Sequence, residues 1–244
     1  MKPVLKFFFI LFLILMIIAL SIYFLSFNQK LYYKDFGNKE QRVRICLIAG
    51  VHGNEPAGSL LFHRLIKNGY FDYIASTQNI FIRVIPSVNE FGLEHNTRYQ
   101  NSLKHPDINR TFTEEGEIHH LSRDLLRLLK DTTLVIDFHE AWGFHRIHPQ
   151  SLGSSITITG DSDTQEVAQL IVQNVNQLIN NPKYRFDVLK RICSIQNTLS
   201  CYLHKRGINY ILVETSGQND VQPVEIRQTQ IVNILDTVFS FFHS

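Results

Sequence analysis

The stretch that decides the fold is Gly50-Val51-His52-Gly53-Asn54-Glu55-Pro56, which lies between an apolar run and an amphipathic one. Residues 43–49 before it have the apolar pattern of a buried strand. Residues 57–69 after it carry leucine and isoleucine at helical spacing. Pro56 suits the first turn of that helix, because its missing N–H would have no partner there. The sequence therefore predicts a glycine-flanked turn from a strand into a helix.

His52 and Glu55 lie three positions apart on this turn, a spacing that can bring both side chains to the same side. A ring nitrogen and a carboxylate oxygen in that arrangement make half of a plausible zinc site, which needs a second histidine from elsewhere. A single His-x-x-Glu is more often an exposed polar turn. The rest of the chain decides between the two interpretations.

Strands and helices alternate along the rest of the chain. Strands are predicted at residues 80–85, 133–138, 155–159 and 208–213, and helices at residues 119–130, 163–180, 197–206 and 224–242. Residues 86–117 are predicted to form a long irregular segment, of a kind that is usually functional or disordered. The alternation predicts an α/β fold with a mixed, largely parallel sheet and helices on both faces.

Three candidate metal or base residues follow directly after predicted strands. They are His52, His139 and Glu214, and open α/β sheets bind their ligands at the carboxyl ends of the strands. His139 supplies the missing imidazole, which leaves a fourth position of the zinc site for water. Glu214 is a candidate general base. The neighbouring Glu140 is interpreted as a residue of the rim.

The long irregular segment carries Arg98 and Arg110, which taken alone are ordinary surface arginines. Beside a zinc site, one arginine can stabilise the oxyanion that forms when water attacks a carbonyl. The other, together with Asn109, can hold a substrate carboxylate through paired donors. The segment therefore supplies candidate substrate-binding residues.

The order of these motifs resembles that of the zinc carboxypeptidase superfamily, which includes the succinylglutamate desuccinylase and aspartoacylase branch. The motifs are His-x-x-Glu at 52–55, Asn-x-x-Gly at 89–92 followed by Arg98, Asp-Ile-Asn-Arg-x-Phe at 107–112, Asp-Phe-His at 137–139, and the late Glu214. The resemblance extends over residues 43–242, which is nearly the whole chain after the N-terminal apolar segment.

The resemblance implies a role for each matching residue. His52, Glu55 and His139 would bind one Zn²⁺ ion, and Glu214 would be the general base. Arg98 would polarise the substrate carbonyl. Asn109 and Arg110 would hold the substrate carboxylate. The implied activity is zinc-dependent hydrolysis of an amide bond next to a free carboxylate, as in carboxypeptidases.

Some features depart from the carboxypeptidase pattern. Glu90-Phe91 stands where those enzymes usually have Pro-Asp, and Tyr184, Tyr202 and Tyr210 are only candidates for their substrate-capping tyrosine. The amino-acid sequence of residues 50–56 is more similar to the deacylase branch. However, the 30 residues after Glu214 are too few for the C-terminal β-domain of aspartoacylases. The expected substrate is therefore a peptide C-terminus or, as the alternative, an N-acyl amino acid. A non-catalytic zinc-binding membrane protein is an alternative of another class.

The first residues predict a membrane anchor. From Phe7 to Leu25 only Ser21 interrupts an apolar run, which is long enough for a bilayer core of roughly 30 Å. A cleaved signal peptide is the alternative, but its apolar region usually has only about 7–15 residues. We expect a single-pass anchor at residues 1–27, inserted through residues 7–27, then a linker at 28–42 and a zinc hydrolase domain at 43–244.

Charge and cysteines bear on the partners and the compartment. The net charge of +2 belongs to residues 1–30, which hold three of the 24 basic residues and no acidic one, so 21 basic residues face 22 acidic ones in the remainder. No basic cluster indicates nucleic-acid binding. The charges flanking the span and a sequon on Asn109-Arg110-Thr111 slightly favour a cytosolic domain. Cys193 and Cys201 could instead pair in a luminal domain, so the sequence leaves the side of the membrane open.

Overall fold

The structure is a computed structural model that describes residues 3–27, 30–100, 107–113, 119–190 and 193–243. The described residues form one seven-stranded sheet in the order β1-β3-β2-β4-β7-β5-β6. Its strands are β1 (Lys34–Phe36), β2 (Arg44–Ala49), β3 (Phe81–Ile85), β4 (Leu134–Ala141), β5 (Ser155–Thr159), β6 (Asp187–Leu189) and β7 (Tyr210–Ser216). The neighbours β3, β2, β4 and β7 run parallel, whereas β1 is antiparallel to β3 and β5 is antiparallel to β7. The predicted mixed, largely parallel sheet is confirmed.

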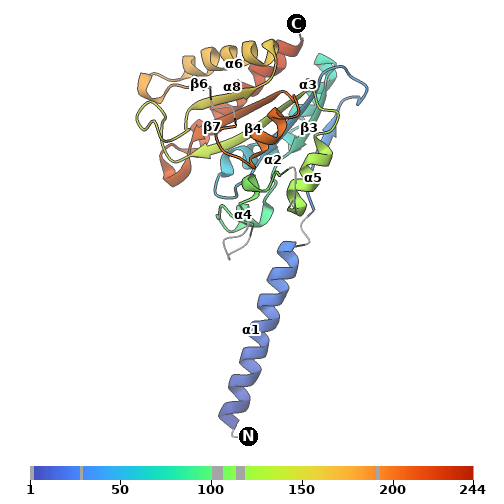
Figure 1. The fold of residues 1–244 in the computed structure, drawn as a ribbon, viewed down its shortest axis with the longest axis vertical. Coiled ribbons are helices and arrows are strands. Elements are labelled where there is room, and N and C mark those ends of the chain that lie inside the picture. The colour runs from blue at the N-terminus through green and yellow to red at the C-terminus, as the bar shows by residue number, and fades with distance from the viewer. Residues whose placement is uncertain (1–2, 28–29, 101–106, 114–118, 191–192, 244) are drawn as a thin grey trace.

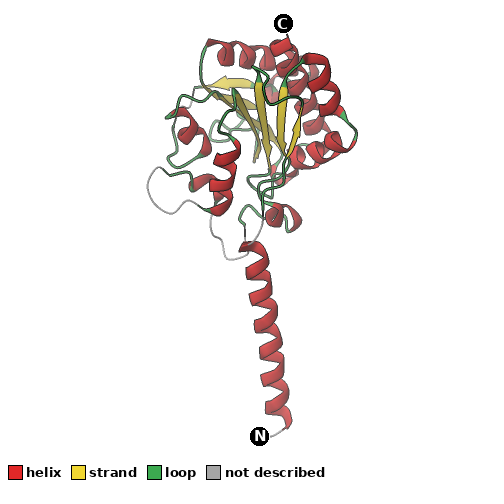
Figure 2. Ribbon diagram, turned by 90° about the vertical axis from the view of Figure 1, so that its right-hand side faces the viewer, coloured by secondary structure: helices red, strands yellow, loops and turns green. Residues whose placement is uncertain are grey.

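Helices cover both faces of this sheet, also as predicted (Figures 1 and 2). One face packs against α2 (Pro56–Lys67), α3 (Tyr70–Gln78), α6 (Ser162–Val175) and α8 (Val224–His243), and the other against α5 (His120–Leu128) and α7 (Leu199–His204). The side chains of strand β2 show why both faces of the sheet need to be covered. Ile45 and Leu47 belong to the first core, whereas the alternating Cys46 and Ile48 belong to the second, because successive side chains of a strand point to opposite faces.

Some short elements were not predicted. Helix α3 and strands β1 and β6 are new, and β1 lies inside the expected linker at residues 28–42. Strand β1 pairs with β3, and the Arg83 guanidinium donates to both carboxylate oxygens of Asp35 at 2.7 and 2.8 Å. A three-residue strand is too short to show alternation in the sequence. Part of the expected linker is therefore an edge strand of the sheet.

The strands that carry candidate site residues are longer than predicted. Strand β4 continues to Ala141 and β7 to Ser216, so His139 and Glu214 lie within strands and are paired across the ladder. In the segment at residues 86–117, the described part contains the short helix α4 (Glu90–Glu94) and a 3₁₀ turn at Ile108–Arg110. Residues 101–106 and 114–117 of that segment lie outside the described residues.

The N-terminal helix α1 (Pro3–Phe27) extends away from the sheet and its helices (Figure 1). Its window Val4–Ser21 has a mean hydropathy of 2.9, and its apolar side chains are exposed. The helix is therefore long and apolar enough to cross a membrane, a property that an N-terminal signal sequence shares.

Candidate active site

The turn between β2 and α2 places His52 and Glu55 as its sequence predicts. Pro56 occupies the first turn of α2, and Glu55 is the residue that precedes the helix. Gly53 is required here because a Cβ at this position would collide with the backbone of Gly92. The close approach packs the turn against the Asn-x-x-Gly segment. There Asn89 accepts a hydrogen bond from the Gly92 N–H at 2.9 Å, and its amide donates to the Arg98 carbonyl at 3.3 Å.

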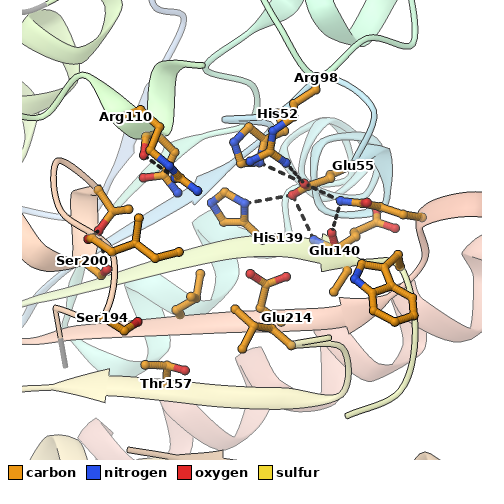
Figure 3. Close-up of a pocket in the computed structure, with 18 of the residues that line it drawn as sticks. His52, Glu55, Arg98, Arg110, His139, Glu140, Thr157, Ser194, Ser200 and Glu214 are labelled. Carbon is orange, nitrogen blue, oxygen red and sulfur yellow. Dashed lines mark hydrogen bonds and ion pairs between the residues drawn. The ribbon is translucent and has the colours of Figure 1, made fainter. Parts of the chain in front are cut away.

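His52, Glu55 and His139 meet in one buried cluster, each of them less than 5 % exposed (Figure 3). One ligand atom from each lies within 4.8 Å of the other two. The Glu55 carboxylate contacts Nδ1 of His52 at 2.9 Å through one oxygen and Nδ1 of His139 at 2.8 Å through the other. Residues 84 positions apart in the chain therefore form the three-donor set that the sequence predicted.

Two aspartates hold the far sides of these imidazoles. Nε2 of His52 lies 3.0 Å from Asp107, and Nε2 of His139 lies 3.2 Å from Asp137. An Nε2–H that donates to a carboxylate leaves the lone pair of Nδ1 on the side of Glu55. Two lone pairs and a carboxylate facing one another call for a cation between them, so the donors fit a metal ion, and zinc accepts this set.

The charges of the cluster are strongly coupled. Burial raises the pKa of Glu55, but His52 and His139 outweigh it and hold that pKa well below the usual range. Burial lowers the pKa of His139, but Asp137 and Glu55 raise it well above its ordinary value. Without a metal, the cluster therefore retains positive charge next to its carboxylate. A bound divalent cation would replace the protons that give the imidazoles this positive charge.

Glu214 lies opposite this cluster on β7 and points into the same pocket (Figure 3). Glu214 is only 8 % exposed, and burial raises the pKa of its carboxyl to about 8. His139 lowers the pKa, whereas Glu55 and Asp137 raise it. A carboxyl that exchanges a proton near neutral pH has the property that a general base needs.

The predicted substrate-binding residues line the same pocket, with different surroundings. The Arg98 guanidinium donates to Asp107 at 2.9 and 3.0 Å and lies 3.4 Å from Glu55. Arg110 is exposed and donates to the Asn109 carbonyl at 2.7 Å. The side-chain oxygen of Asn109 accepts the Leu199 N–H at 2.9 Å. Arg98 is thus tied to the metal-site cluster, whereas Arg110 keeps a guanidinium at the pocket surface.

Glu140 is not a rim residue, contrary to the prediction. It is 3 % exposed, forms an ion pair with Arg227 of α8, and accepts the Ala57 N–H of α2 at 2.6 Å. The amide of Gln218 donates to Glu55 at 2.8 Å and to the Glu140 carbonyl at 2.6 Å. These contacts join the strand that carries His139 to the helix that follows Glu55, so they support the metal-site geometry from behind.

The floor of the pocket is formed by neighbouring positions of β5 and β7. Thr157 pairs with Leu212 across the antiparallel ladder, so both side chains project from the same face. The Thr157 hydroxyl is buried without a hydrogen-bond partner. Of the candidate capping tyrosines, Tyr210 lines the pocket but is buried, and donates to Asp137 at 2.9 Å. The pocket therefore combines charged walls with a neutral floor.

Comparison with known proteins agrees with this geometry. Residues 41–151 match the model of the succinylglutamate desuccinylase/aspartoacylase catalytic domain, a segment that contains His52, Glu55 and His139. A search of curated proteins found no match.

Solved structures share the fold at low sequence identity. Csd4 from Helicobacter pylori, described as a D,L-carboxypeptidase and solved with bound mDAP, has 16 % identity and a TM-score of 0.69 over 86 % of this chain and 54 % of its own. A protein provisionally named a metallopeptidase from Shewanella amazonensis has 17 % identity and a TM-score of 0.65 over 89 % of each chain. An aspartoacylase family protein from Mesorhizobium loti has 19 % identity and a TM-score of 0.57 over 86 % of this chain and 61 % of its own.

The chain spans about half the length of Csd4 and nine-tenths of the Shewanella amazonensis protein. The family match over residues 41–151 and the shared fold show that this chain is similar to proteins of the zinc carboxypeptidase-like superfamily.

Proposed function

We propose that this chain is a zinc hydrolase that cleaves an amide bond next to a free carboxylate. The observation that carries the proposal is the convergence of His52, Glu55 and His139 on one point, with Glu214 facing them in the same pocket. Zinc at that point would act as a Lewis acid toward the substrate carbonyl and would lower the pKa of water. Two histidines, one glutamate and an open fourth position are typical of catalytic zinc sites.

The residues around this point each have a chemical role in the proposal. Glu214 takes a proton from the attacking water and returns it to the leaving nitrogen, a role that fits its raised pKa. The guanidinium of Arg98 stabilises the oxyanion. Arg110 and the amide of Asn109 bind the substrate carboxylate through charge-assisted hydrogen bonds. Asp107 and Asp137 keep the two imidazoles in the metal-binding tautomer.

Two substrate classes fit this chemistry, each favoured by one observation. Peptide C-termini are favoured by the shared fold with Csd4, which is described as a D,L-carboxypeptidase. N-acyl amino acids are favoured by the match to the succinylglutamate desuccinylase/aspartoacylase catalytic domain. We propose the carboxypeptidase-like activity as the function and the deacylase as the second candidate.

We also propose that α1 anchors the enzyme in a membrane as a single-pass helix. Its length, its hydropathy and the exposure of its apolar side chains support this assignment. Recovery of the chain in the carbonate-resistant membrane fraction, with its N-terminus retained, would support an uncleaved anchor. A mature chain that begins after residue 21 would instead identify a signal peptide.

The test compares matched substrates on the purified, zinc-loaded full chain. Each peptide is offered as the free acid and as the C-terminal amide, beside a panel of N-acyl amino acids. We expect cleavage of free acids only, loss of that preference in Arg110→Gln, and loss of kcat with retained zinc in Glu214→Gln. Cleavage of acyl amino acids alone would assign the deacylase function. Zinc binding without turnover of either class would assign a binding protein.

A further inference from the structure

One wall of the pocket is a loop that a disulfide closes. Cys193 and Cys201 are bonded to each other, eight positions apart. Four of the residues between these two cysteines line the pocket, namely Ser194, Ile195, Thr198 and Ser200. The loop from Cys193 to Cys201 is called the cystine loop below.

The first half of the cystine loop has little burial of its own, whereas Thr198, Leu199 and Cys201 are buried. Residues 194–197 are exposed, and Cys193 and Asn197 have left-handed backbone conformations, with φ of 50° and 61°. Such a conformation is unfavourable for Cys193, whereas asparagine tolerates it better than most residues other than glycine. The disulfide therefore ties the exposed residues 194–197 to the buried start of helix α7.

Two hydrogen bonds join the cystine loop to the segment that carries the carboxylate-binding residues. The Leu199 N–H donates to the side-chain oxygen of Asn109 at 2.9 Å. The Asn197 carbonyl accepts the Phe112 N–H at 3.1 Å. With its oxygen engaged, the amide of Asn109 has a fixed orientation, and its NH₂ group is the part that can donate to a carboxylate. The loop therefore sets the position of Asn109.

We propose that the Cys193–Cys201 disulfide is a positioning element of the substrate-carboxylate site. It fixes the cystine loop, and through the Leu199–Asn109 hydrogen bond it fixes the amide that binds the substrate, so the oxidised protein binds substrate more tightly than the reduced one. The part about substrate affinity rests on the proposed function; the part about the position of Asn109 does not. Cys46 takes no part, because it is fully buried in the core beneath the sheet.

Reduction opens the ring by a defined step. Dithiothreitol gives two electrons and two protons, the S–S bond becomes two thiols, and the reductant becomes its cyclic disulfide. Because the released loop no longer fixes Asn109, we expect KM for a free-acid substrate to rise roughly tenfold, the effect of losing one hydrogen bond to a charged group. We expect kcat to change less than about twofold, since Glu214 and the metal ligands lie on strands β4 and β7 and on the turn before α2.

The experiment uses three proteins, each as the zinc-loaded full chain. Wild type and Cys46→Ala are measured before and after dithiothreitol, beside the double variant C193S/C201S treated in the same way. Thiol titration of denatured wild type should give one thiol before reduction and three after it. Wild type and Cys46→Ala should both show the rise in KM. The double variant should have the raised KM from the start and should not respond to the reductant.

A readout that does not need activity separates the two parts of the proposal. Amide hydrogen exchange at Leu199 and Phe112 should become faster on reduction of wild type and should be fast throughout in C193S/C201S. If exchange accelerates but no substrate is cleaved in any form, the proposed function fails while the positioning role of the disulfide stands.

Three results would overturn the proposal. One is three titratable thiols in the unreduced protein. The second is full reduction with unchanged exchange and unchanged KM. The third is an equal response of C193S/C201S to dithiothreitol, which would assign the effect to removal of the metal by the reductant.

Discussion

Glu214→Gln should make the metal-free protein more stable at high pH, because it removes a buried negative charge. The pKa of Glu214 is about 8 in the folded protein, against an ordinary value of 4.5. Between these two values the folded chain binds a proton that the unfolded chain has lost. Each unit of rising pH therefore lowers the free energy of unfolding of wild type by about 1.4 kcal/mol. Above pH 8 this contribution no longer changes.

The expected size of the effect follows from the same pKa values. From pH 5 to pH 9 wild type should lose about 4 kcal/mol from this one group, whereas the variant has no carboxyl to titrate there. Groups far from this cluster titrate alike in the two proteins, so the difference between them reports Glu214 and the charges coupled to it. Glutamine has nearly the same shape, and the pocket needs no repacking.

The assay is urea unfolding of both proteins after metal removal with a chelator, at pH values from 5 to 9. The stability difference should favour the variant increasingly as pH rises and should level off above pH 8. A difference that stays within 1 kcal/mol over the whole range would refute the claim that burial keeps this carboxyl protonated near neutral pH. A repetition with zinc-loaded protein would show how far a bound cation relieves the buried charge.

Other substitutions test the metal site, its support and the pocket floor. His139→Ala should lower the zinc content after dialysis from one ion per chain to less than a tenth of that. Added zinc should raise the Tm of wild type but not that of the variant. One tightly held ion in the variant would show that His139 does not belong to the donor set. Arg227→Met should cost roughly 3–5 kcal/mol of unfolding free energy in urea, because it leaves the Glu140 carboxylate buried and unpaired. Adding Glu140→Gln should recover part of that loss, and full additivity in the double-mutant cycle would contradict the pairing. Thr157→Val should raise the free energy of unfolding by about 1 kcal/mol, because the buried hydroxyl has no partner. It should also lower kcat/KM roughly tenfold for substrates with a hydroxyl or amide side chain, but not for substrates that end in alanine. Equal losses of kcat/KM for both kinds of substrate would show that the Thr157 hydroxyl does not recognise the substrate.

The sequence predicted the elements that carry the candidate metal site because each has a long local signal. The turn at residues 50–56 combines a buried strand, two glycines and a proline before a helix, and the structure has all of them. His139 and Glu214 were expected just after strands and instead lie near the ends of longer ones. The side chains still converge, because the carboxyl ends of parallel strands share one edge of the sheet.

The sequence did not predict the contacts between distant polar residues. Asp107 and Asp137 belong to recognisable motifs, and Asp137 alternates with His139 on the same strand, a spacing that places both side chains on one face. That signal was available and could have identified a partner for the imidazole. The pairing of Glu140 with Arg227 has no local signal, because 87 residues separate them and neither position looks apolar. The bridge between Cys193 and Cys201 was an open alternative because spacing alone does not decide whether two thiols meet.

The ion pair between Glu140 and Arg227 has a consequence for synthesis of the protein. All three candidate metal donors have been translated once residue 139 is added, but Arg227, whose guanidinium secures the strand behind them, is added 88 residues later, on helix α8. A nascent chain stalled before α8 would therefore hold its imidazoles and Glu55 without their rear support, and it should bind zinc weakly. Metal uptake in the living cell would then mark the moment at which translation of the domain is complete.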